Sequence, residues 1–351
     1  MPILAEVVDA VVGVDTHRDT HHAAITDAVG ACLSTLQITN TTAGFAELLS
    51  WILQHAPGPR VVVSIEGTRS YGIGLARAIT NAGLQVIECE QPTHRARRGG
   101  GKSDSIDAHL AARYALTLDA DQLPTPRADG DREALRILLG TRHELTVTTT
   151  AQTNRLRALL LSGEDADRSL SRVTLSDTVL TTLARRRLAP NADRSHTVRH
   201  REVRRLAIAL REAARALKSN RQEISDVVDA LVPGLIDIRG VGPVTAAQVI
   251  ISYSHVGRVR SEAAFAAMAG TSPLEASSGR TTRHRLNRGG DRALNRAIHT
   301  IALTRMRSCP RTRDYVNRWT AEGKTSREVR RMLKRYITRQ LYRTLTATTA
   351  T

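Results

Sequence analysis

Cysteine and aromatic residues are scarce in this chain of 351 residues. The three cysteines, Cys32, Cys89 and Cys309, are scattered and form no CxxC pair. This argues against a zinc site or a disulfide framework and favours a reducing, cytoplasmic environment. Phe, Trp and Tyr number 2, 2 and 6. We therefore do not expect stacking of single-stranded bases on aromatic rings to be the main binding mode.

Long apolar runs and nucleotide-binding glycine motifs are also absent. The chain has no run of about 18 uninterrupted apolar residues and no recognisable signal peptide, so we expect neither a membrane span nor export. Gly72 and Gly74 lack the rest of a dinucleotide-binding fingerprint, and they are expected to serve packing at a helix start. No P-loop occurs, which argues against the use of ATP.

Acidic residues are outnumbered, and their distribution is uneven. Lys and Arg number 51 against 34 Asp and Glu, giving a formal net charge of +17, which calls for a polyanion or a membrane surface as partner. Residues 1–94 contain four Arg, no Lys and nine acids, whereas residues 95–351 carry a net charge of +22. We expect the basic part to bind phosphates and the acidic part to hold cations.

The hydrophobic pattern of the first 122 residues predicts an α/β domain. Three runs joined by short connections predict an antiparallel meander of strands, at residues 11–16, 22–27 and 32–38. A helix, a buried strand, a second helix and a further strand then alternate, at residues 43–56, 61–67, 70–82 and 84–89. This order matches the ribonuclease-H-like arrangement.

Helical patterns dominate the rest of the chain. Residues 131–162 and 201–231 have few helix breakers and predict two arms of a helical hairpin or coiled coil, whereas the Arg-rich stretch 165–200 predicts no definite structure. Further helices are predicted at 104–116, 291–307, 312–321 and 326–345. We therefore predict a ribonuclease-H-like domain, a helical coiled-coil region and a helical C-terminal domain, at residues 8–122, 130–232 and 233–348.

Four carboxylates occupy positions where they can converge. Asp15 and Glu66 end two predicted strands, and Asp104 and Asp107 stand three residues apart at the start of a helix. Clustered carboxylates repel one another unless cations neutralise them, and Mg²⁺ prefers oxygen ligands. The set therefore predicts a two-metal phosphoryl-transfer site for magnesium or manganese. Taken singly, Asp15 and Asp104 are also explained as a turn residue and a helix cap.

Two glycine-containing turns are candidates for binding phosphates. Gly240 and Gly242 lie in the segment IRGVGPVTAAQVII, which has the turn of a helix-hairpin-helix, and the next helix would direct its amides at a DNA phosphate. A tight helix–helix turn without a ligand explains the same pattern. Earlier in the chain, the loop RARRGGGK at 95–102 contributes further basic candidates, namely Arg95, Arg97, Arg98 and Lys102.

A Ser-Ser-Gly step opens a basic, turn-rich segment at 277–279. Four arginines follow it, namely Arg280, Arg283, Arg285 and Arg288. A serine needs activation and close placement to act as a nucleophile, which arginines and a metal-bound phosphate can supply. From the residues alone, a solvated phosphate-binding loop is the better explanation of the segment. His17, His21 and His22 are interpreted as a turn and a strand face rather than a zinc site. The arginines at 185–187 and 327–335 are interpreted as phosphate-facing surface.

Several segments together resemble one family. VVGVDTHRDTHHAAI, VVVSIEGT and KSDSIDAHLAAR resemble the three nuclease motifs of DEDD-type insertion-sequence transposases, whose N-terminal domain is similar to Holliday-junction resolvases. QTNRLRALL at 152–160 resembles that family's asparagine–arginine helix, here with Asn154, Arg155 and Arg157. The segments IRGVGPVTAAQVI and SSGRTTRHRLNRGGDRALNRA resemble its C-terminal transposase domain. Where the family has a Lys/Arg-Gly-Asn step and then Leu-Arg, this chain has Gly290-Asp291 and Leu294-Asn295.

The resemblance implies a function that periodicity alone does not give. Its members excise and insert DNA by recombination, and they are similar to enzymes guided by a structured non-coding bridge RNA that pairs with donor and target DNA. The resemblance assigns Asp15, Glu66, Asp104 and Asp107 to the acidic site and Ser278, with Ser277 in reserve, to a nucleophile that forms a phosphoserine link. It also implies dimers or tetramers whose shared sites combine acids and serine from different subunits.

Two other functions remain open at the level of the sequence. A junction-resolving endonuclease would use the acids alone and leave the Ser-Gly segment without a role. A non-catalytic DNA- or RNA-binding protein would explain the charge of 95–351 but not four acids at motif positions. Covalent attachment of DNA to the protein would distinguish the recombinase from both alternatives.

Overall fold

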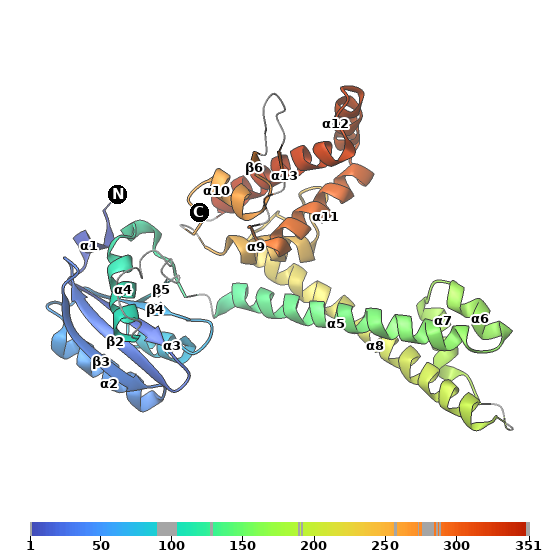
Figure 1. Cartoon of the computed structure of the whole chain (residues 1–351), viewed down its shortest axis with the longest axis horizontal. Helices are drawn as coiled ribbons and strands as arrows, with labels where there is room; N and C mark the ends of the chain where they lie inside the picture. The colour runs from blue at the N-terminus through green and yellow to red at the C-terminus, as the bar shows by residue number, and fades with distance from the viewer. Residues whose placement is uncertain are drawn as a thin grey trace. The chain divides into compact units, whose positions relative to one another are not determined.

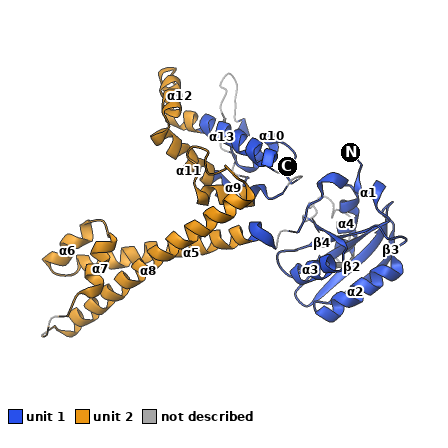
Figure 2. Cartoon of the chain, turned by 180° about the vertical axis from the view of Figure 1, so that it is seen from behind, with its two compact units in different colours: residues 1–133, 252–295, 331–351 blue, residues 134–251, 296–330 orange. Residues whose placement is uncertain are grey.

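A computed structural model describes residues 2–89, 104–126, 129–188, 190, 192–255, 258–272, 274–275, 284–285, 287 and 289–348. The chain is traced from end to end in Figure 1. It forms two compact units, each built from separate stretches of sequence (Figure 2). Unit 1 comprises residues 1–133, 252–295 and 331–351, and unit 2 comprises residues 134–251 and 296–330.

The first part of unit 1 contains a five-stranded sheet in the order β3-β2-β1-β4-β5. β1 pairs antiparallel with β2, and β2 with β3, whereas β1–β4 and β4–β5 are parallel. The strands are β1 (Ala10–Thr16), β2 (Thr20–Asp27), β3 (Cys32–Thr39), β4 (Val61–Glu66) and β5 (Gln85–Cys89). β1 and β4 are central, which explains why their sequences are nearly continuous apolar runs.

Helices cover both faces of this sheet (Figure 1). On one face, α2 and α3 form a core with the even-numbered residues of β1. On the other face, α4 packs its alanines against β1 and β4. The helices of this part are α1 (Leu4–Val7), α2 (Thr42–His55), α3 (Ile73–Asn81), α4 (Asp104–Leu116) and the short 3₁₀ helix η1 (Ala120–Gln122).

Unit 2 is built around two long helices, α5 (Gly130–Leu161) and α8 (Arg194–Leu231). Arg142 of α5 donates to the carbonyl of Leu217 at 3.1 Å, and Asn220 of α8 donates to the carbonyl of Leu138 at 3.0 Å. These bonds hold the two helices together where α5 has few buried residues. Leucines of α5, α7 and α8 form a second core near the far end of α5. The short helices between the two arms are α6 (Asp165–Arg172) and α7 (Asp177–Arg185).

The described residues of the C-terminal third form helices and one short strand pair. The rings of Tyr253, Phe265 and Tyr342 lie 5.8–6.2 Å apart and join three helices, α9, α10 and α13. The pair β6–β7 is antiparallel. The elements are α9 (Pro243–Tyr253), α10 (Glu262–Met268), β6 (Leu274–Glu275), β7 (His284–Arg285), α11 (Arg292–Ser308), α12 (Pro310–Ala321) and α13 (Ser326–Thr348).

The observed fold confirms the expected mixture of a small α/β sheet domain with many helices, and it is compatible with a ribonuclease-H-like N-terminal domain. The predicted helix 104–116 has the same bounds as α4. The stretch 165–200, for which no structure was predicted, contains α6, α7 and the first turns of α8. No described helix is both long and apolar enough to cross a membrane.

Candidate active site

Two predicted acids lie side by side at one edge of the sheet. β1 and β4 are parallel and adjacent, with Val14 opposite Ile65, so the next residues, Asp15 and Glu66, lie at neighbouring strand ends. Val14 and Ile65 both face the core beneath α2 and α3. Because side chains alternate along a strand, Asp15 and Glu66 both lie on the α4 face. Asp15 is buried and Glu66 is half-buried.

Helix α4 brings the other two acids to the same edge. A Cβ atom on Gly13 would lie only 2.0 Å from the carbonyl oxygen of Ala108, so the glycine allows the helix to approach the strand closely. Val11 packs in the cluster that holds the last turns of α4, and Gly13 contacts Ala108. The helix therefore runs antiparallel to β1 and begins at the carboxyl edge of the sheet, where Asp104 and Asp107 lie in its first turn.

A histidine contacts the buried acid of this site. His17 Nε2 lies 3.2 Å from Asp15 Oδ2, and His22 is the register partner of Asp15 on β2. The rings of His17 and His22 lie 6.5 Å apart. His21 lies on the opposite face, stacked on Phe45, and burial lowers the pKa of its imidazole. The three histidines therefore do not form one cluster, and His17 is a neighbour of the acids that the sequence analysis did not assign to the site.

The acidic edge has donor atoms of the kind that divalent metals prefer. Its described donors are carboxylate oxygens, which suit a hard divalent cation such as Mg²⁺ or Mn²⁺. Within residues 2–89 and the other described stretches, no three His, Cys, Asp or Glu side chains are close enough to form a metal-binding group. The side chain of Asp104 lies outside the described part of the chain. Asp15, Glu66 and Asp107 therefore offer suitable donor atoms at one edge of the sheet, but among the described residues their side chains do not form a three-ligand group.

The predicted serine lies in a segment bracketed by two paired strands. Leu274 of β6 pairs with Arg285 of β7, and Glu275 pairs with His284. The side chains of His284 and Arg285 lie outside the described part of the chain. Several predicted residues lie outside the described stretches, namely Arg95, Arg97, Arg98, Lys102, Ser277, Ser278, Arg280, Arg283 and Arg288.

A polar network lies just after β7, at the start of α11. The carboxylate of Asp291 caps this helix, accepting from the amides of Ala293 and Leu294 at 2.8 and 3.0 Å, and it also accepts from the hydroxyl of Ser252 at 2.6 Å. One turn later, the side-chain amide of Asn295 donates to the backbone carbonyl of Ala269 at 2.6 Å. The return of the chain from β7 is therefore fixed to the helical core by hydrogen bonds.

The network also contains a buried cation. Lys334 of α13 is only 9% exposed and donates to Asn295 Oδ1 at 2.8 Å. Burial lowers the pKa of its ammonium group, because the charged form is poorly solvated there. The sequence analysis did not single out Lys334, because helical periodicity alone does not reveal its burial.

The two glycines of the predicted helix-hairpin-helix have different surroundings. Gly240 has a positive φ of 84°, and a Cβ atom there would lie 2.8 Å from Arg305 Cγ, so this glycine serves a tight turn against α11. Gly242 has open space on its Cβ side. Its amide donates to the hydroxyl of Thr245 at 3.0 Å, so this amide already has a partner at the start of α9.

The asparagine–arginine helix motif lies near the end of α5. Leu156 and Leu160 are buried in the core with α7 and α8, whereas Asn154 and Arg155 are exposed. Arg157 is half-buried and donates to the carbonyls of Ser171 and Val173. Arg157 therefore also fixes the end of α6.

Comparison with known proteins decides the family. Residues 12–163 match a family model for DEDD-type IS110 transposases, described as "Transposase", and residues 234–317 match the "Transposase IS116/IS110/IS902 family". This chain belongs to the IS110 family of transposases. It is therefore a DNA transposase, an enzyme of insertion-sequence recombination. The transposase is also 24% identical over 368 residues to the "Insertion element IS110 uncharacterized 43.6 kDa protein" of Streptomyces coelicolor, covering 91% of this chain and 90% of the relative.

The two family matches divide this IS110-type transposase in an informative way. The first runs from β1 through α4 to the end of α5, and it contains Asp15, Glu66, Asp104 and Asp107. The second runs from just before α9 into α12 and contains Ser278. Neither covers residues 164–233, which form α6, α7 and α8. The family implies DNA as substrate and suggests a divalent metal at the DEDD acids.

Proposed function

We propose that this transposase cleaves DNA and exchanges strands with four acids and a serine nucleophile. The observation that carries the proposal is the common edge of β1, β4 and α4, where Asp15, Glu66 and Asp107 belong to adjacent elements. These three acids and Asp104 would hold magnesium or manganese, which when bound neutralises charge on the reacting phosphate and stabilises the attacking and leaving oxygens. The hydroxyl of Ser278, with Ser277 in reserve, would attack the DNA phosphate.

The chain's own residues supply the other parts of this chemistry. Attack by the serine forms a bond from its oxygen to phosphorus and breaks the bond from phosphorus to the sugar oxygen of one DNA strand. The serine hydroxyl gives up its proton, and the released sugar oxygen takes one up. His17, in contact with Asp15, would hold that carboxylate in a fixed orientation. The arginines beside the serine, Arg280, Arg283, Arg285 and Arg288, would bind the crowded phosphate.

We also propose how the nucleic acids are bound. The partners would be donor and target duplex DNA and a structured guide RNA. Basic candidates on the loop after β5 and on α5 would bind phosphates, namely Arg95, Arg97, Arg98, Lys102, Asn154, Arg155 and Arg157. Gly242 leaves room for a phosphate in a helix-hairpin-helix contact, supported by the open space beside it and by the tight turn at Gly240.

The long helices favour assembly of several copies. We propose that α5 and α8 form a coiled-coil region through which dimers or tetramers assemble, and that the acids of one subunit then act with the serine of another. We propose three domains, at residues 8–122, 130–232 and 233–348. They would carry the metal-binding acids, the assembly surface and the serine, respectively. The exposed Val147 and Ile137 of α5 support an assembly surface, since 56% and 55% of their surface remains accessible in the single chain.

The decisive experiment is a search for covalent attachment of DNA to the protein. Wild-type protein is expected to form a metal-dependent adduct with donor DNA that survives denaturing electrophoresis, and Ser278→Ala is expected to form none while still binding DNA. Ser277→Ala is the matched control and should retain the adduct. Cleavage without an adduct would favour a junction-type endonuclease, and binding without cleavage would favour a non-catalytic binding protein. Wild-type recombination by a protein that carries both Ser277→Ala and Ser278→Ala would refute the serine mechanism.

A mixing experiment tests the shared site. Neither Asp15→Ala nor Ser278→Ala protein should recombine DNA alone. Their mixture should regain activity if one subunit supplies the acids and another the serine. An inactive mixture of two folded, co-assembling variants would show that each site is built within one subunit.

A further inference from the structure

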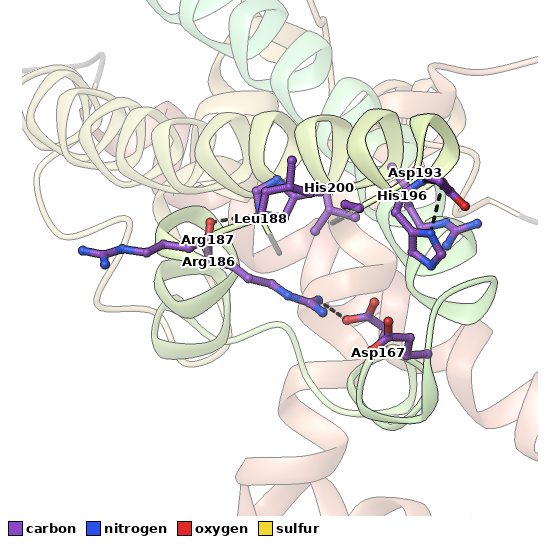
Figure 3. A pocket seen from close by; sticks show the side chains of 11 residues that line it. Asp167, Arg186, Arg187, Leu188, Asp193, His196 and His200 are labelled. Atoms are coloured by element: carbon purple, nitrogen blue, oxygen red, sulfur yellow. Dashed lines mark hydrogen bonds and ion pairs between the residues drawn. The ribbon is translucent and has the colours of Figure 1, made fainter. Parts of the chain in front are cut away.

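A cavity of about 420 Å³ lies where α6, the end of α7 and the start of α8 meet (Figure 3). It belongs to the stretch that neither transposase family match covers. Its lining combines three arginines, two histidines, three carboxylates and apolar side chains. A volume of this size suits a small organic ligand or one unit of a polymer, since ligand pockets typically span about 300–1,000 Å³.

One wall of the cavity is fixed by an ion pair whose carboxylate is buried. The carboxylate of Asp167 is only 10% exposed and pairs with the guanidinium of Arg186 (Figure 3). His200 Nε2 donates to the carbonyl oxygen of Arg186 at 3.0 Å. Loss of Arg186 would leave the buried carboxylate without this partner, so the pair holds the segment after α7 against α6. Arg186 is therefore a structural member of the basic run at 185–187.

The opposite wall is the first turn of α8. Asp193 caps this helix by accepting from the amide of His196 at 2.8 Å, and His196 Nδ1 lies 3.1 Å from the same oxygen. Hydrogen bonds from His196 and Ser195 lower the pKa of Asp193 to about 2, so this carboxylate is ionised at neutral pH. The wall thus presents an imidazole ring and a fixed anionic acceptor.

Two lining cations remain without a partner among the described residues. Arg187 and Arg199 line the cavity, and neither forms a hydrogen bond or ion pair with any side chain or backbone group that the structure describes. Arg187 extends away from Arg186 in Figure 3. Leu188 and Val203 contribute apolar surface to the same cavity. The site therefore offers cations for a phosphate, an apolar surface for a ring and carboxylates for amino groups.

We propose that this cavity binds one unpaired nucleotide of a nucleic-acid strand. Arg187 and Arg199 would bind its phosphates, and the base would lie between Val203 and the imidazole of His196. Unpaired bases are commonly recognised in this way, stacked on imidazole or guanidinium planes and bound along their edges. Asp167 and Asp193 can only accept hydrogen bonds when ionised, so they favour bases that carry an amino group. The inference rests on the proposed binding of structured nucleic acid.

The test compares two RNA stem-loops that differ by one bulged cytidine. Full-length wild-type protein is expected to bind the bulged stem-loop about tenfold more tightly at fixed salt, because stacking of one base contributes on this scale. A bulged uridine, which has no amino group, should show a smaller preference. The same pair built in DNA tells whether the nucleotide comes from RNA or from a distorted DNA strand.

Variants separate the cavity from general basic charge. The Arg187→Ala, Arg199→Ala variant should lose the preference for the bulge. The Arg185→Ala, Arg194→Ala variant removes the same charge from exposed residues nearby that do not line the cavity, and it should weaken both stem-loops equally. Ala192→Phe fills the cavity without changing charge and should abolish the preference while leaving binding of the unbulged stem-loop unchanged.

The outcomes distinguish failure of this inference from failure of the proposed function. Wild-type protein that binds both stem-loops equally would overturn the cavity proposal and leave an RNA partner standing. Equal loss of preference in the matched control variant would likewise assign the effect to surface charge. Wild-type protein that binds no RNA or DNA stem-loop would overturn the cavity proposal together with nucleic-acid guidance, whereas the adduct assay with Ser278→Ala would still test the serine mechanism.

Discussion

Replacing Gly13 by alanine should separate the two halves of the proposed acidic site. A Cβ atom at this position would lie 2.0 Å from the carbonyl oxygen of Ala108 and 2.5 Å from the amide nitrogen of Ala112. Both are backbone atoms, so no rotation of a side chain relieves the clash. To restore an ordinary carbon–oxygen contact, α4 must move away from β1 by roughly 1 Å or more.

This geometry bounds the expected loss of stability and of cleavage rate. Overpacking a tight core typically costs about 1–3 kcal/mol, so the variant should remain folded with a lower melting temperature. A displacement of about 1 Å at a catalytic group can reduce the rate about 10²-fold. Because α4 carries Asp104 and Asp107 whereas β1 carries Asp15, we expect DNA cleavage to fall on this scale.

Three measurements test this reasoning. Thermal unfolding reports the packing cost, cleavage of donor DNA reports the displacement, and DNA affinity should stay unchanged. Gly140→Ala is the matched control, because nothing lies within 4 Å of its Cβ position in the middle of α5, and this change should leave cleavage intact. Ala112→Gly should not rescue Gly13→Ala, since the closest clash is with the backbone of Ala108. A Gly13→Ala protein with wild-type stability and cleavage would refute the close packing of α4 on β1.

Other predictions follow from charge and titration. Asp15→Asn should abolish cleavage while DNA binding persists in a filter assay, and DNA affinity should fall steeply between low and physiological salt because the basic body displaces counterions. Burial lowers the pKa of Lys334 in the folded state. Between that lowered pKa and 10.5, the unfolded chain therefore binds more protons than the folded protein, and the free energy of unfolding rises with pH. Lys334→Met should remove this rise, measured by chemical denaturation at a series of pH values. Asp193 contributes stability that is complete above pH 3.8 and is lost as pH falls through about 2; Asp193→Asn keeps the cap and should remove this loss from acid titrations followed by circular dichroism.

The sequence predicted the sheet domain well because its strands obey strict patterns. β1 and β4 are short apolar runs with an acid at or near the end. The meander of β1, β2 and β3 follows from the short connections between these strands. The position of His17 beside Asp15 was not predicted, although His17 lies in the tight turn that directly follows β1. The partners of a turn residue depend on side-chain directions that strand periodicity does not specify.

The region between the two long helices shows why other parts were missed. The buried residues of α6 are Asp167 and Ser171, so no apolar periodicity marks this helix. Asp167 is held by Arg186, nineteen positions later in the chain, and a Cβ atom on Gly163 would lie 2.5 Å from the carboxylate of Asp167. Such a structure depends on a specific ion pair and on space beside one glycine. Hydrophobic pattern analysis detects neither.

The C-terminal departures from the family pattern also have a physical reading. Asp291 replaces the usual asparagine, and both residues are good helix N-caps, which is the role that Asp291 has at α11. By the resemblance, Asn295 stands where the family has an arginine, so this position of α11 carries no charge. Lys334 of α13 provides one instead, 2.8 Å from Asn295 Oδ1. Since a buried cation there needs a polar neighbour, Asn295 and Lys334 are expected to depend on each other, and restoring Arg at 295 should be tolerated only when Lys334 is replaced by an uncharged residue.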